Sequence, residues 1–302
     1  MRAEGVTPPP GAIDVLVVGE AVMDIVQTAD ACVEHVGGSP ANVALGLGRR
    51  GIAVGLFSQI GDDARGQRIV AHLTASGVHI LDESMTTSPT STALARIAAG
   101  GHAEYDFEVR WRALGSAPAG VTPRVLHTGS VAAFLEPGAS SVRDLLRRSR
   151  AAEITFDPNI RAGLLGPRDE VVGAFEETAR MSTVVKLSDE DAAWLYPGLS
   201  ADAVIDRLLS LGPQVVAMTL GDRGAMIANA GDRVSVRARD VAPVDTIGAG
   251  DTFMASLIHA VLDGGSAGLD RARLRRICQD AVDAAAVTVS RSGADLPWAS
   301  EL

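Results

Sequence analysis

Short apolar runs alternate with longer segments of helical period along most of the chain. Six runs have the length of buried strands: residues 13–19, 53–61, 125–129, 153–157, 183–187 and 214–220. The segments between them repeat apolar residues at helical spacing and predict helices over 40–51, 63–77, 139–150, 168–181 and 200–212. Strands that alternate with helices predict a parallel sheet with right-handed crossovers, so we expect a doubly wound α/β fold.

Two regions break this alternation, residues 23–36 and 86–112, which are richer in threonine and alternate polar with apolar side chains. In the stretch AEYDFEV, Tyr105 and Phe107 fall on one face and acidic residues on the other, which is typical of a half-exposed antiparallel strand. The glycines of AAGGHAE predict a hairpin turn before it. We therefore expect a small extra β-sheet outside the main layer, formed by two segments that are distant in sequence.

No internal repeat or low-complexity linker separates independent domains. We therefore expect a single domain over residues 1–302. The α/β core would comprise about 12–22, 37–85 and 113–302, and the small sheet, acting as a lid, about 23–36 and 86–112.

Composition narrows the classes of function. The 302-residue chain carries a formal net charge of −10, which disfavours nucleic acid as a partner because that interaction needs a basic face. No apolar run approaches the roughly 18 residues of a membrane span, and the N-terminus lacks a signal-peptide pattern. The two cysteines form no metal-spaced pair. We expect a cytoplasmic protein that binds neither nucleic acid nor membrane.

The stretch PVDTIGAGDTFMASLIHAVL, residues 243–262, removes side chains just before a predicted helix and then places a carboxylate at the helix start. Gly248, Ala249 and Gly250 would expose backbone N–H groups that attract anions. Asp251 would repel a phosphate alone, but it suits a site that brings a phosphoryl group and a hydroxyl together and takes the hydroxyl's proton. The alternative is an Asp-Thr cap that only stabilises the helix.

The scarcity of lysine excludes one kind of phosphate site. Lys186 is the only lysine in the chain, so the Gly-Lys pair of a Walker A loop is absent. The segment after the first predicted strand, VVGEAVMD, has one glycine where a dinucleotide fingerprint needs three. A phosphate cradle made of backbone N–H groups therefore remains.

A second glycine-rich segment, VGGSPANVALGLGRRG, covers residues 36–51. Gly38 permits close backbone approach, and Asn42 offers a donor and an acceptor near the helix start. Gly46 and Gly48 each cost a helix about 1 kcal/mol relative to alanine, which predicts close packing against a neighbour. Taken alone, the segment indicates a tight turn and a helix packed hard against the sheet.

Together, GGSPANVALGLGRRG, IGDD at 60–63 and DTIGAGDTF at 245–253 resemble the two signature regions of the ribokinase-like (PfkB) family of ATP-dependent sugar kinases. Their order and separation fit, and the similarity runs from about residue 13 to 297. TSPTSTALARI, TFDPNIR, VKLSDED and TLGDRGA favour the bacterial fructokinase branch. The resemblance implies a three-layer, doubly wound, mainly parallel sheet with a small β-sheet lid. It also implies ATP and Mg²⁺ as cofactors.

The resemblance assigns roles on the acceptor side. Asp251 matches the catalytic base, and the three small residues before it, Gly248, Ala249 and Gly250, match the anion hole. The implied sugar contacts are Asp24, Gly38 and Asn42. Asp245 and the carbonyl of Ile247 match a monovalent-cation site, with K⁺ as the expected ion. From the residues themselves, Arg161 is a further candidate for a substrate or phosphate contact, because TFDPNIR follows a predicted strand.

On the nucleotide side, the glycines of TLGDRG match the turn against the nucleotide, and the helix within ICQDAVDAAAVTVSRSGADLP borders the adenine in the family. The expected nucleotide contacts are Lys186, Ser188, Thr219, Gly221, Gly224, Ala281 and Ala285. Lys186 could equally form a structural ion pair. Many family members have Asn-x-x-Glu where this chain reads Ser188-Asp189-Glu190-Asp191. Glu190 and Asp191 could hold Mg²⁺ through waters, or could form only a solvated helix start.

We therefore predict γ-phosphoryl transfer from ATP to a sugar hydroxyl, with the 6-hydroxyl of fructose as the first expectation. 2-Keto-3-deoxygluconate, ribose and nucleosides are alternative acceptors. We expect Trp111 and Trp194 to pack, although Phe107 or Trp111 could instead cover the sugar from the lid. A non-catalytic sugar- or nucleotide-binding regulator is the alternative from another class, which the intact Gly-Ala-Gly-Asp disfavours. The exposed lid sheet favours a homodimer through the lid.

Overall fold

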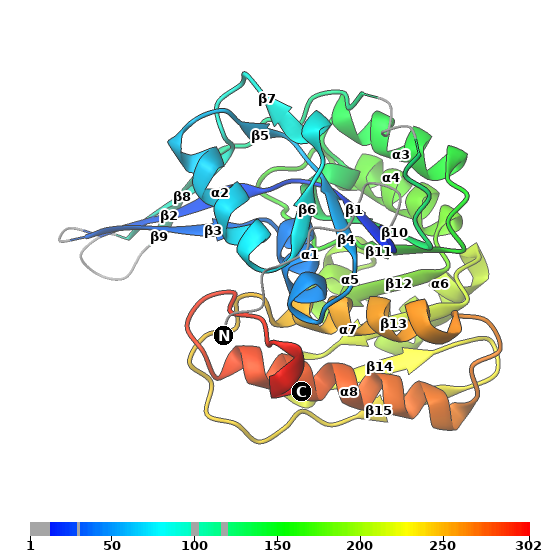
Figure 1. Cartoon of the computed structure of the whole chain (residues 1–302). Helices are drawn as coiled ribbons and strands as arrows, with labels where there is room; N and C mark the ends of the chain where they lie inside the picture. Colours follow the sequence, from blue (N-terminus) through cyan, green and yellow to red (C-terminus); the bar gives the residue numbers. More distant parts are fainter. Residues whose placement is uncertain (1–12, 29–30, 98–102, 116–119) are drawn as a thin grey trace.

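A computed structural model gives the fold, and it describes residues 13–28, 31–97, 103–115 and 120–302. The main sheet has nine strands (Figure 1). Their order is β15 (Arg233–Val236), β14 (Ala225–Ala228), β13 (Val215–Thr219), β12 (Val184–Ser188), β11 (Glu153–Asp157), β10 (Val125–Gly129), β1 (Val15–Val18), β4 (Val54–Phe57) and β6 (Val78–Ile80). The strands from β13 to β6 run parallel, and β14 and β15 add an antiparallel edge.

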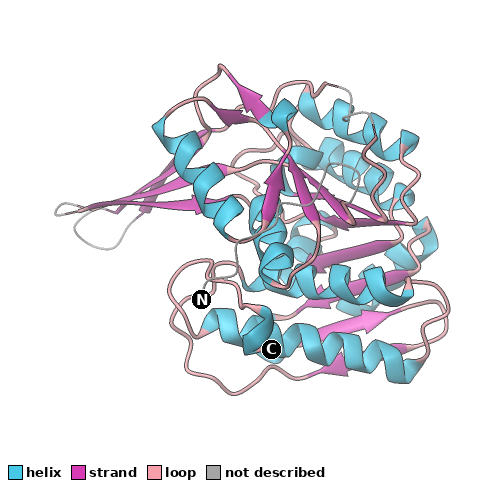
Figure 2. Ribbon diagram, in the orientation of Figure 1, coloured by secondary structure: helices cyan, strands magenta, loops and turns pink. Residues whose placement is uncertain are grey.

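Helices cover both faces of the main sheet (Figure 2). They are α1 (Ser39–Arg49), α2 (Ala64–Ala75), α3 (Gly138–Arg148), α4 (Arg168–Met181), α5 (Asp189–Leu195), α6 (Ala201–Leu211), α7 (Ala249–Gly264) and α8 (Arg271–Val289). Short 3₁₀ turns are η2 (Asp82–Ser84), η3 (Ser130–Ala133), η4 (Gly221–Arg223) and η5 (Ala299–Glu301). α1, α2, α7 and α8 share one core face, whereas α3 to α6 pack on the other.

The central strands are buried on both sides because helices cover both faces. In β1, Val15 and Val17 belong to the core under α1 and α7, while Leu16 and Val18 belong to the core under α3. A continuous apolar run is therefore required in place of alternation. This explains why the strands of the main sheet were recognisable as short apolar runs.

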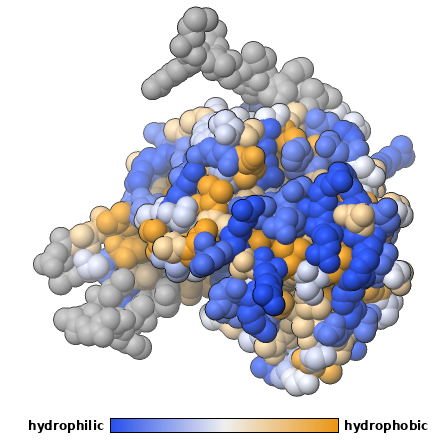
Figure 3. Space-filling model, turned by 90° about the horizontal axis from the view of Figure 1, so that it is seen from below, coloured by the Kyte–Doolittle hydropathy of each residue, from blue (hydrophilic) through white to orange (hydrophobic). Residues whose placement is uncertain are grey.

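A separate four-stranded sheet extends from the core, at left in Figure 1. Its order is β3 (Cys32–Gly37), β2 (Val22–Gln27), β8 (Thr92–Ile97) and β9 (Ala103–Glu108). α2 packs against β2 and β3. The surface in Figure 3 is mostly hydrophilic, and apolar residues gather over the small sheet; Val33 of β3 is exposed. The residue limits of core and lid stay a prediction.

The predicted fold class is confirmed, with two differences in detail. Residues 53–61 are not one strand, because the chain leaves the main sheet after Phe57 and forms β5 (Ile60–Gly61), which pairs with β7 (Met85–Thr86). The edge hairpin of β14 and β15 was not predicted, since each strand has only four residues. The expected hairpin turn of AAGGHAE lies mainly outside the described residues. No described helix is long and apolar enough to cross a membrane.

Candidate active site

The candidate site lies where parallel strands end at one edge of the main sheet. β10 and β11 end at Gly129 and Asp157, which are paired in register, and β12 and β13 end at the paired Ser188 and Thr219. In sequence order, β4 and β6 lie on one side of β1 in the sheet, and β10 and the later strands lie on its other side. The direction in which strands are added therefore reverses at β1. Open α/β sheets bind ligands at such a switch point, beyond the carboxyl ends of the strands.

α7 begins at this edge without bulky side chains. Its N-cap residue, Gly248, has φ +80°, a left-handed conformation that favours glycine, and a Cβ there would lie 2.9 Å from Ala294. The N–H of Ala249 donates to the carbonyl of Thr246 at 3.3 Å. Gly250 and Asp251 follow in the first turn, where helical N–H groups have no acceptor within the helix. The helix start is therefore suited to bind an anion.

The carboxylate of Asp251 is buried and is held by the start of α1. Ser39 Oγ donates to Asp251 Oδ1 at 2.6 Å, and Asn42 Nδ2 donates to Oδ2 at 2.8 Å. Ser39 and Asp251 are separated by 212 positions in the sequence. The two glycine-rich segments therefore meet at one carboxylate, whose orientation is fixed by a neighbouring helix.

Lys186 places a positive charge beside the start of α7. Its ammonium donates to Asp157 Oδ2 at 2.8 Å, and a Cβ on Gly250 would lie 2.9 Å from Nζ. Burial alone would lower the pKa of Lys186, but the carboxylates of Asp157, Asp191 and Asp251 raise it above its ordinary value. The ammonium is therefore charged at neutral pH. Burial raises the pKa of Asp157 to about 6, although Lys186 opposes that rise.

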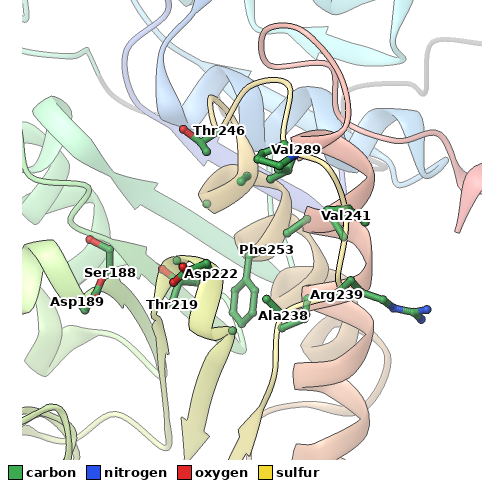
Figure 4. A pocket seen from close by; sticks show the side chains of 18 of the residues that line it. Ser188, Asp189, Thr219, Asp222, Ala238, Arg239, Val241, Thr246, Phe253 and Val289 are labelled. Carbon is green, nitrogen blue, oxygen red and sulfur yellow. The ribbon is translucent and has the colours of Figure 1, made fainter.

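A cavity of about 760 Å³ opens beside Lys186 and the start of α7. Figure 4 shows Ser188 and Asp189 on one side and Ala238, Arg239 and Val241 on the other, with Phe253 between them. Small and apolar residues of α8 also line the cavity: Val282, Ala285, Ala286 and Val289. The cavity thus combines a polar, charged end with an apolar wall, as a nucleotide requires.

The predicted nucleotide contacts that line this cavity are Lys186, Ser188, Thr219, Gly221, Gly224 and Ala285. Gly224 has φ +96°, and a Cβ there would lie 2.0 Å from the carbonyl oxygen of Val236, so the turn requires glycine. The expected nucleotide contact of Ala281 stays a prediction. Its side chain is fully buried in the core one helical turn before Ala285, and it does not line the cavity.

The two acidic residues proposed for magnesium differ in their surroundings. The carboxylate of Asp191 accepts N–H groups from Ile160 at 2.8 Å and Ser188 at 2.9 Å, the latter within the capping box that starts α5. Glu190 is exposed and lines the cavity. Within the described residues, no group of three or more His, Cys, Asp and Glu side chains could hold a metal. Glu190 is therefore the more accessible of the two carboxylates.

Asp245 and Ile247 lie in the loop immediately before α7. Asp245 accepts N–H groups from Ile247 at 3.0 Å and from Gly293 at 2.9 Å. These hydrogen bonds lower the pKa of the Asp245 carboxyl, led by the one from Ile247. The carboxylate thus ties the loop before α7 to the turn after α8, and the two predicted cation-site residues lie together.

Asp24 and Arg161 lie outside the lining of this cavity but share an electrostatic environment with Asp251. Burial raises the pKa of Asp24 to about 6; the positive charges of Arg161 and His35 oppose the rise, and Asp251 adds to it. His35 is the cross-strand partner of Asp24 in the small sheet. The small sheet therefore delivers a carboxylate towards the acidic residue of α7.

Glu20 was not predicted from the sequence as a site residue. Glu20 is buried, and its pKa responds to Arg161, as that of Asp24 does. Its Oε2 accepts the N–H of Ala132 at 3.1 Å, and burial raises its pKa to about 7 against the opposing charge of Arg161. Gly38, a predicted sugar contact, has φ +99°, and a Cβ there would lie 2.6 Å from the carbonyl oxygen of Glu20. The glycine turn before α1 and the end of β1 are therefore in close contact.

The two aromatic residues considered as covers for the sugar behave differently. Trp111 is a core residue, with 3% of its surface exposed and its Nε1 donating to the carbonyl of Ala132 at 3.1 Å. It cannot cover a ligand, because its ring packs where a Cβ on Gly138 would lie. Phe107 is partly buried and lies 4.0 Å from the Cβ position of Gly163, in the loop after Arg161.

Sequence reasoning missed several residues that the structure brings to the site. Ser39 stood within GGSPAN, and its position at the helix start was the signal available. Arg239 and Val241 line the cavity, but neither belongs to a motif that was singled out; Phe253 also lines it and ends the stretch DTIGAGDTF, yet no role was predicted for its ring. These residues come from three different segments, and only the folded chain brings them together.

Comparisons with known proteins bear on the family and the fold of the chain. The model of the pfkB family carbohydrate kinases matches residues 12–301. A fructokinase from Rhizobium leguminosarum bv. trifolii is 31% identical over 258 residues, which cover 82% of this chain and 79% of the relative. A sugar kinase from Pyrococcus horikoshii, solved with ATP, has a TM-score of 0.76 at 25% identity, covering 95% of this chain and 96% of that one.

A fructokinase from Vibrio cholerae, solved with fructose, ADP and potassium, shares the fold. Its TM-score is 0.78 at 23% identity, and the alignment covers 94% of each chain.

Proposed function

The chain belongs to the PfkB family of carbohydrate kinases, and from that premise we propose that its acceptor is fructose, phosphorylated at the 6-hydroxyl. It is an ATP-dependent kinase that transfers a phosphoryl group to an alcohol. The identity of the sugar and the roles of individual residues are the proposal.

One contact carries the assignment of roles: the carboxylate of Asp251, fixed by Ser39 and Asn42 at the start of α7. We assign to Asp251 the orientation of the sugar hydroxyl and the uptake of its proton as the bond to phosphorus forms. The N–H groups of Gly248 to Gly250 would stabilise the negative charge on the transferred phosphoryl group. Lys186, beside Gly250, would add the one nearby ammonium to this cradle.

The charges on the sugar side support an uncharged acceptor. The charge of Arg161 lowers the pKa of both Glu20 and Asp24, and the charge of Asp251 raises the pKa of Asp24, so these charged groups act on one another. A sugar acid would therefore meet more negative than positive charge there, whereas hydroxyl groups can accept from Arg161 and donate to carboxylates. This favours fructose over 2-keto-3-deoxygluconate. The fructokinase relative at 31% identity supports the same choice.

The residues fit a magnesium ion that arrives with ATP and keeps several waters, as Mg²⁺ commonly does. Glu190 is exposed on the cavity wall and would hold such an ion through water. When bound, the ion would neutralise charge on the phosphates. Asp191 would act indirectly, because its carboxylate already accepts two backbone N–H groups.

We further propose that K⁺ occupies a site formed by Asp245 and the carbonyl of Ile247. The loop that carries both residues leads directly into the anion hole, so an ion there would influence the orientation of the first turn of α7. The potassium-bound fructokinase from Vibrio cholerae has the same fold, which makes the loop the place to test.

The deciding experiment measures ADP release with ATP and Mg²⁺ over fructose, ribose, 2-keto-3-deoxygluconate and a nucleoside, with the Asp251→Asn protein as the blank. We expect the highest kcat/KM for fructose, with phosphate at O6 by NMR. A higher value for another acceptor would replace fructose, and no turnover with any acceptor would favour a regulator. Repeating the assay in K⁺ and in tetramethylammonium tests the cation site, which a flat response would contradict.

A further inference from the structure

Residues 293–298 follow α8 and contact the loop before α7, the N-cap residue of α7, and α1. We call this segment the C-terminal strap. The N–H of Gly293 donates to Asp245, the residue that anchors the loop before α7. Ala294 and Leu296 pack against Gly248, at 2.9 Å and 3.3 Å from the position of a Cβ on that glycine. The strap therefore forms the back of the turn that presents the anion-binding N–H groups.

Arg49, the last residue of α1, fastens this strap. One guanidinium nitrogen, Nη1, donates to Asp295 Oδ1 at 2.7 Å and also to the carbonyl oxygen of Leu296. The guanidinium carbon lies 5.2 Å from the centre of the Trp298 ring, a cation–π distance. The Arg49 side chain is only 10% exposed, whereas the Asp295 side chain is 46% exposed, so the bond to the carbonyl of the buried Leu296 is better shielded from solvent and salt than the ion pair.

α1 thus contacts the catalytic region from both of its ends. Its first turn holds the carboxylate of Asp251 through Ser39 and Asn42, and its last residue holds the strap behind Gly248. Leu296 is fully buried and packs on Gly46, where a Cβ would lie 2.6 Å away. The glycine in the middle of α1 therefore leaves room for the strap, which explains why the helix tolerates it.

We propose that Arg49 is a positioning residue that acts through the C-terminal strap on the anion hole at Gly248–Gly250. Arg49 is not among the residues that line the cavity. Without Arg49 the strap keeps only the packing of Leu296 on Gly46 as its tie to α1, the surface on which Gly248 rests loosens, and the N–H groups of the first turn of α7 shift. Such a shift matters most when charge develops on the transferred phosphoryl group. The inference rests on the proposed role of the anion hole, and it is independent of which sugar is the acceptor.

The test compares Arg49→Ala and the milder Asp295→Asn with Arg291→Ala. Arg291 is the matched control, because it pairs with Asp295 and Glu301 within the same C-terminal region and makes no tie to α1. With the best acceptor, we expect Arg49→Ala to lower kcat on the order of 10- to 100-fold, since a misplacement of about 1 Å can cost 10²-fold. KM for ATP and for the sugar should stay within about twofold of the wild-type values.

A second measurement separates positioning from a general loss of stability. Below the melting temperature of each variant, Arg49→Ala should bind ADP normally but lose affinity for ADP with aluminium fluoride, which mimics the transferred phosphoryl group. Asp295→Asn should show a smaller loss of the same kind. Equal kcat in the Arg49→Ala and Arg291→Ala proteins, or a parallel loss of affinity for ADP alone, would overturn the proposal. If instead Asp251→Asn stays active, the proposed catalytic role fails, whatever the Arg49 variants show.

Discussion

The side-chain amide of Asn42 donates to the carboxylate of Asp251 across 2.8 Å, although the two residues lie 209 positions apart. With Ser39 on the other oxygen, the Asp251 carboxylate cannot rotate freely. Asn42 was expected only as a sugar contact. The structure shows a further contact, because the Asn42 amide helps to fix the orientation of the Asp251 carboxylate.

Replacement of Asp251 by asparagine should abolish most of the turnover while leaving nucleotide binding intact. A carboxamide at this position is not a proton acceptor, so kcat should fall by roughly 10²- to 10⁴-fold. The amide of Asn42 can flip to present its oxygen, which keeps the local hydrogen bonds and the fold. The measurements are steady-state kinetics and ATP titration by calorimetry.

The matched control for that substitution is Asp263→Asn, on the exposed last part of the same helix. It should behave as the wild type in both measurements. Turnover by the Asp251→Asn protein at more than about a tenth of the wild-type rate would remove Asp251 from its assigned role.

Lys186→Met should weaken both folding and nucleotide binding. Removing the ammonium leaves the fully buried carboxyl of Asp157 without its partner, which costs on the order of 3–5 kcal/mol. The double variant Asp157→Asn/Lys186→Met removes both charges and should recover most of that free energy of unfolding. Denaturant unfolding of the single and double variants measures it.

Affinity for ATP distinguishes the two tasks proposed for Lys186. Because Nζ lies beside Gly250, both the single and the double variant should bind ATP more weakly than the wild type. If the double variant regained normal ATP affinity as well as stability, Lys186 would be only half of a structural ion pair.

Glu20→Gln should make the protein more stable at alkaline pH. Burial raises the folded-state pKa of Glu20 from 4.5 to about 7, so the native state holds a proton that the unfolded chain releases. Stability conferred by the neutral carboxyl is therefore present below about pH 4.5 and is lost as the pH rises to about 7. The carboxamide of the variant is neutral throughout and can still accept the N–H of Ala132.

At pH 8 the free energy of unfolding of the Glu20→Gln protein should exceed that of the wild type by at most about 3 kcal/mol. At pH 4.5 the difference should be near zero. Chemical denaturation at the two pH values measures the difference. Glu83→Gln, at an exposed position in η2, is the control and should change neither value. A pH-independent effect of Glu20→Gln would show that folding does not change the pKa of Glu20.

The sequence was most informative where local pattern and local chemistry coincide. The run 214–220 predicted β13 because a doubly covered parallel strand must be apolar throughout. DTIGAGDTF predicted the start of α7 because an anion-binding turn needs small residues there. In contrast, β14 and β15 have four residues each, which is too short for a periodic signal.

The sequence was least informative where the outcome depends on what packs from elsewhere in the chain. Ala281 and Ala285 are one turn apart on α8 and look equivalent in sequence, but only Ala285 reaches the cavity. Trp111 lies next to the lid in sequence, yet its indole is buried against Ala132 and Gly138. Neither burial nor direction can be read from residue type alone.

Apolar periodicity and two glycine-rich motifs were sufficient to predict the layered sheet, the glycine turn at the start of α7 and the acidic residue in its first turn, because backbone conformation and strand burial impose those residue types locally. Three features depend on contacts between segments up to 247 positions apart. They are the hydrogen-bond partners of that acidic residue, the ammonium beside Gly250, and the contacts of Arg49 with the C-terminal strap. Such contacts exist only once the chain has closed on itself, since hydrogen bonds and packing act over a few ångströms of space, whatever the distance along the chain.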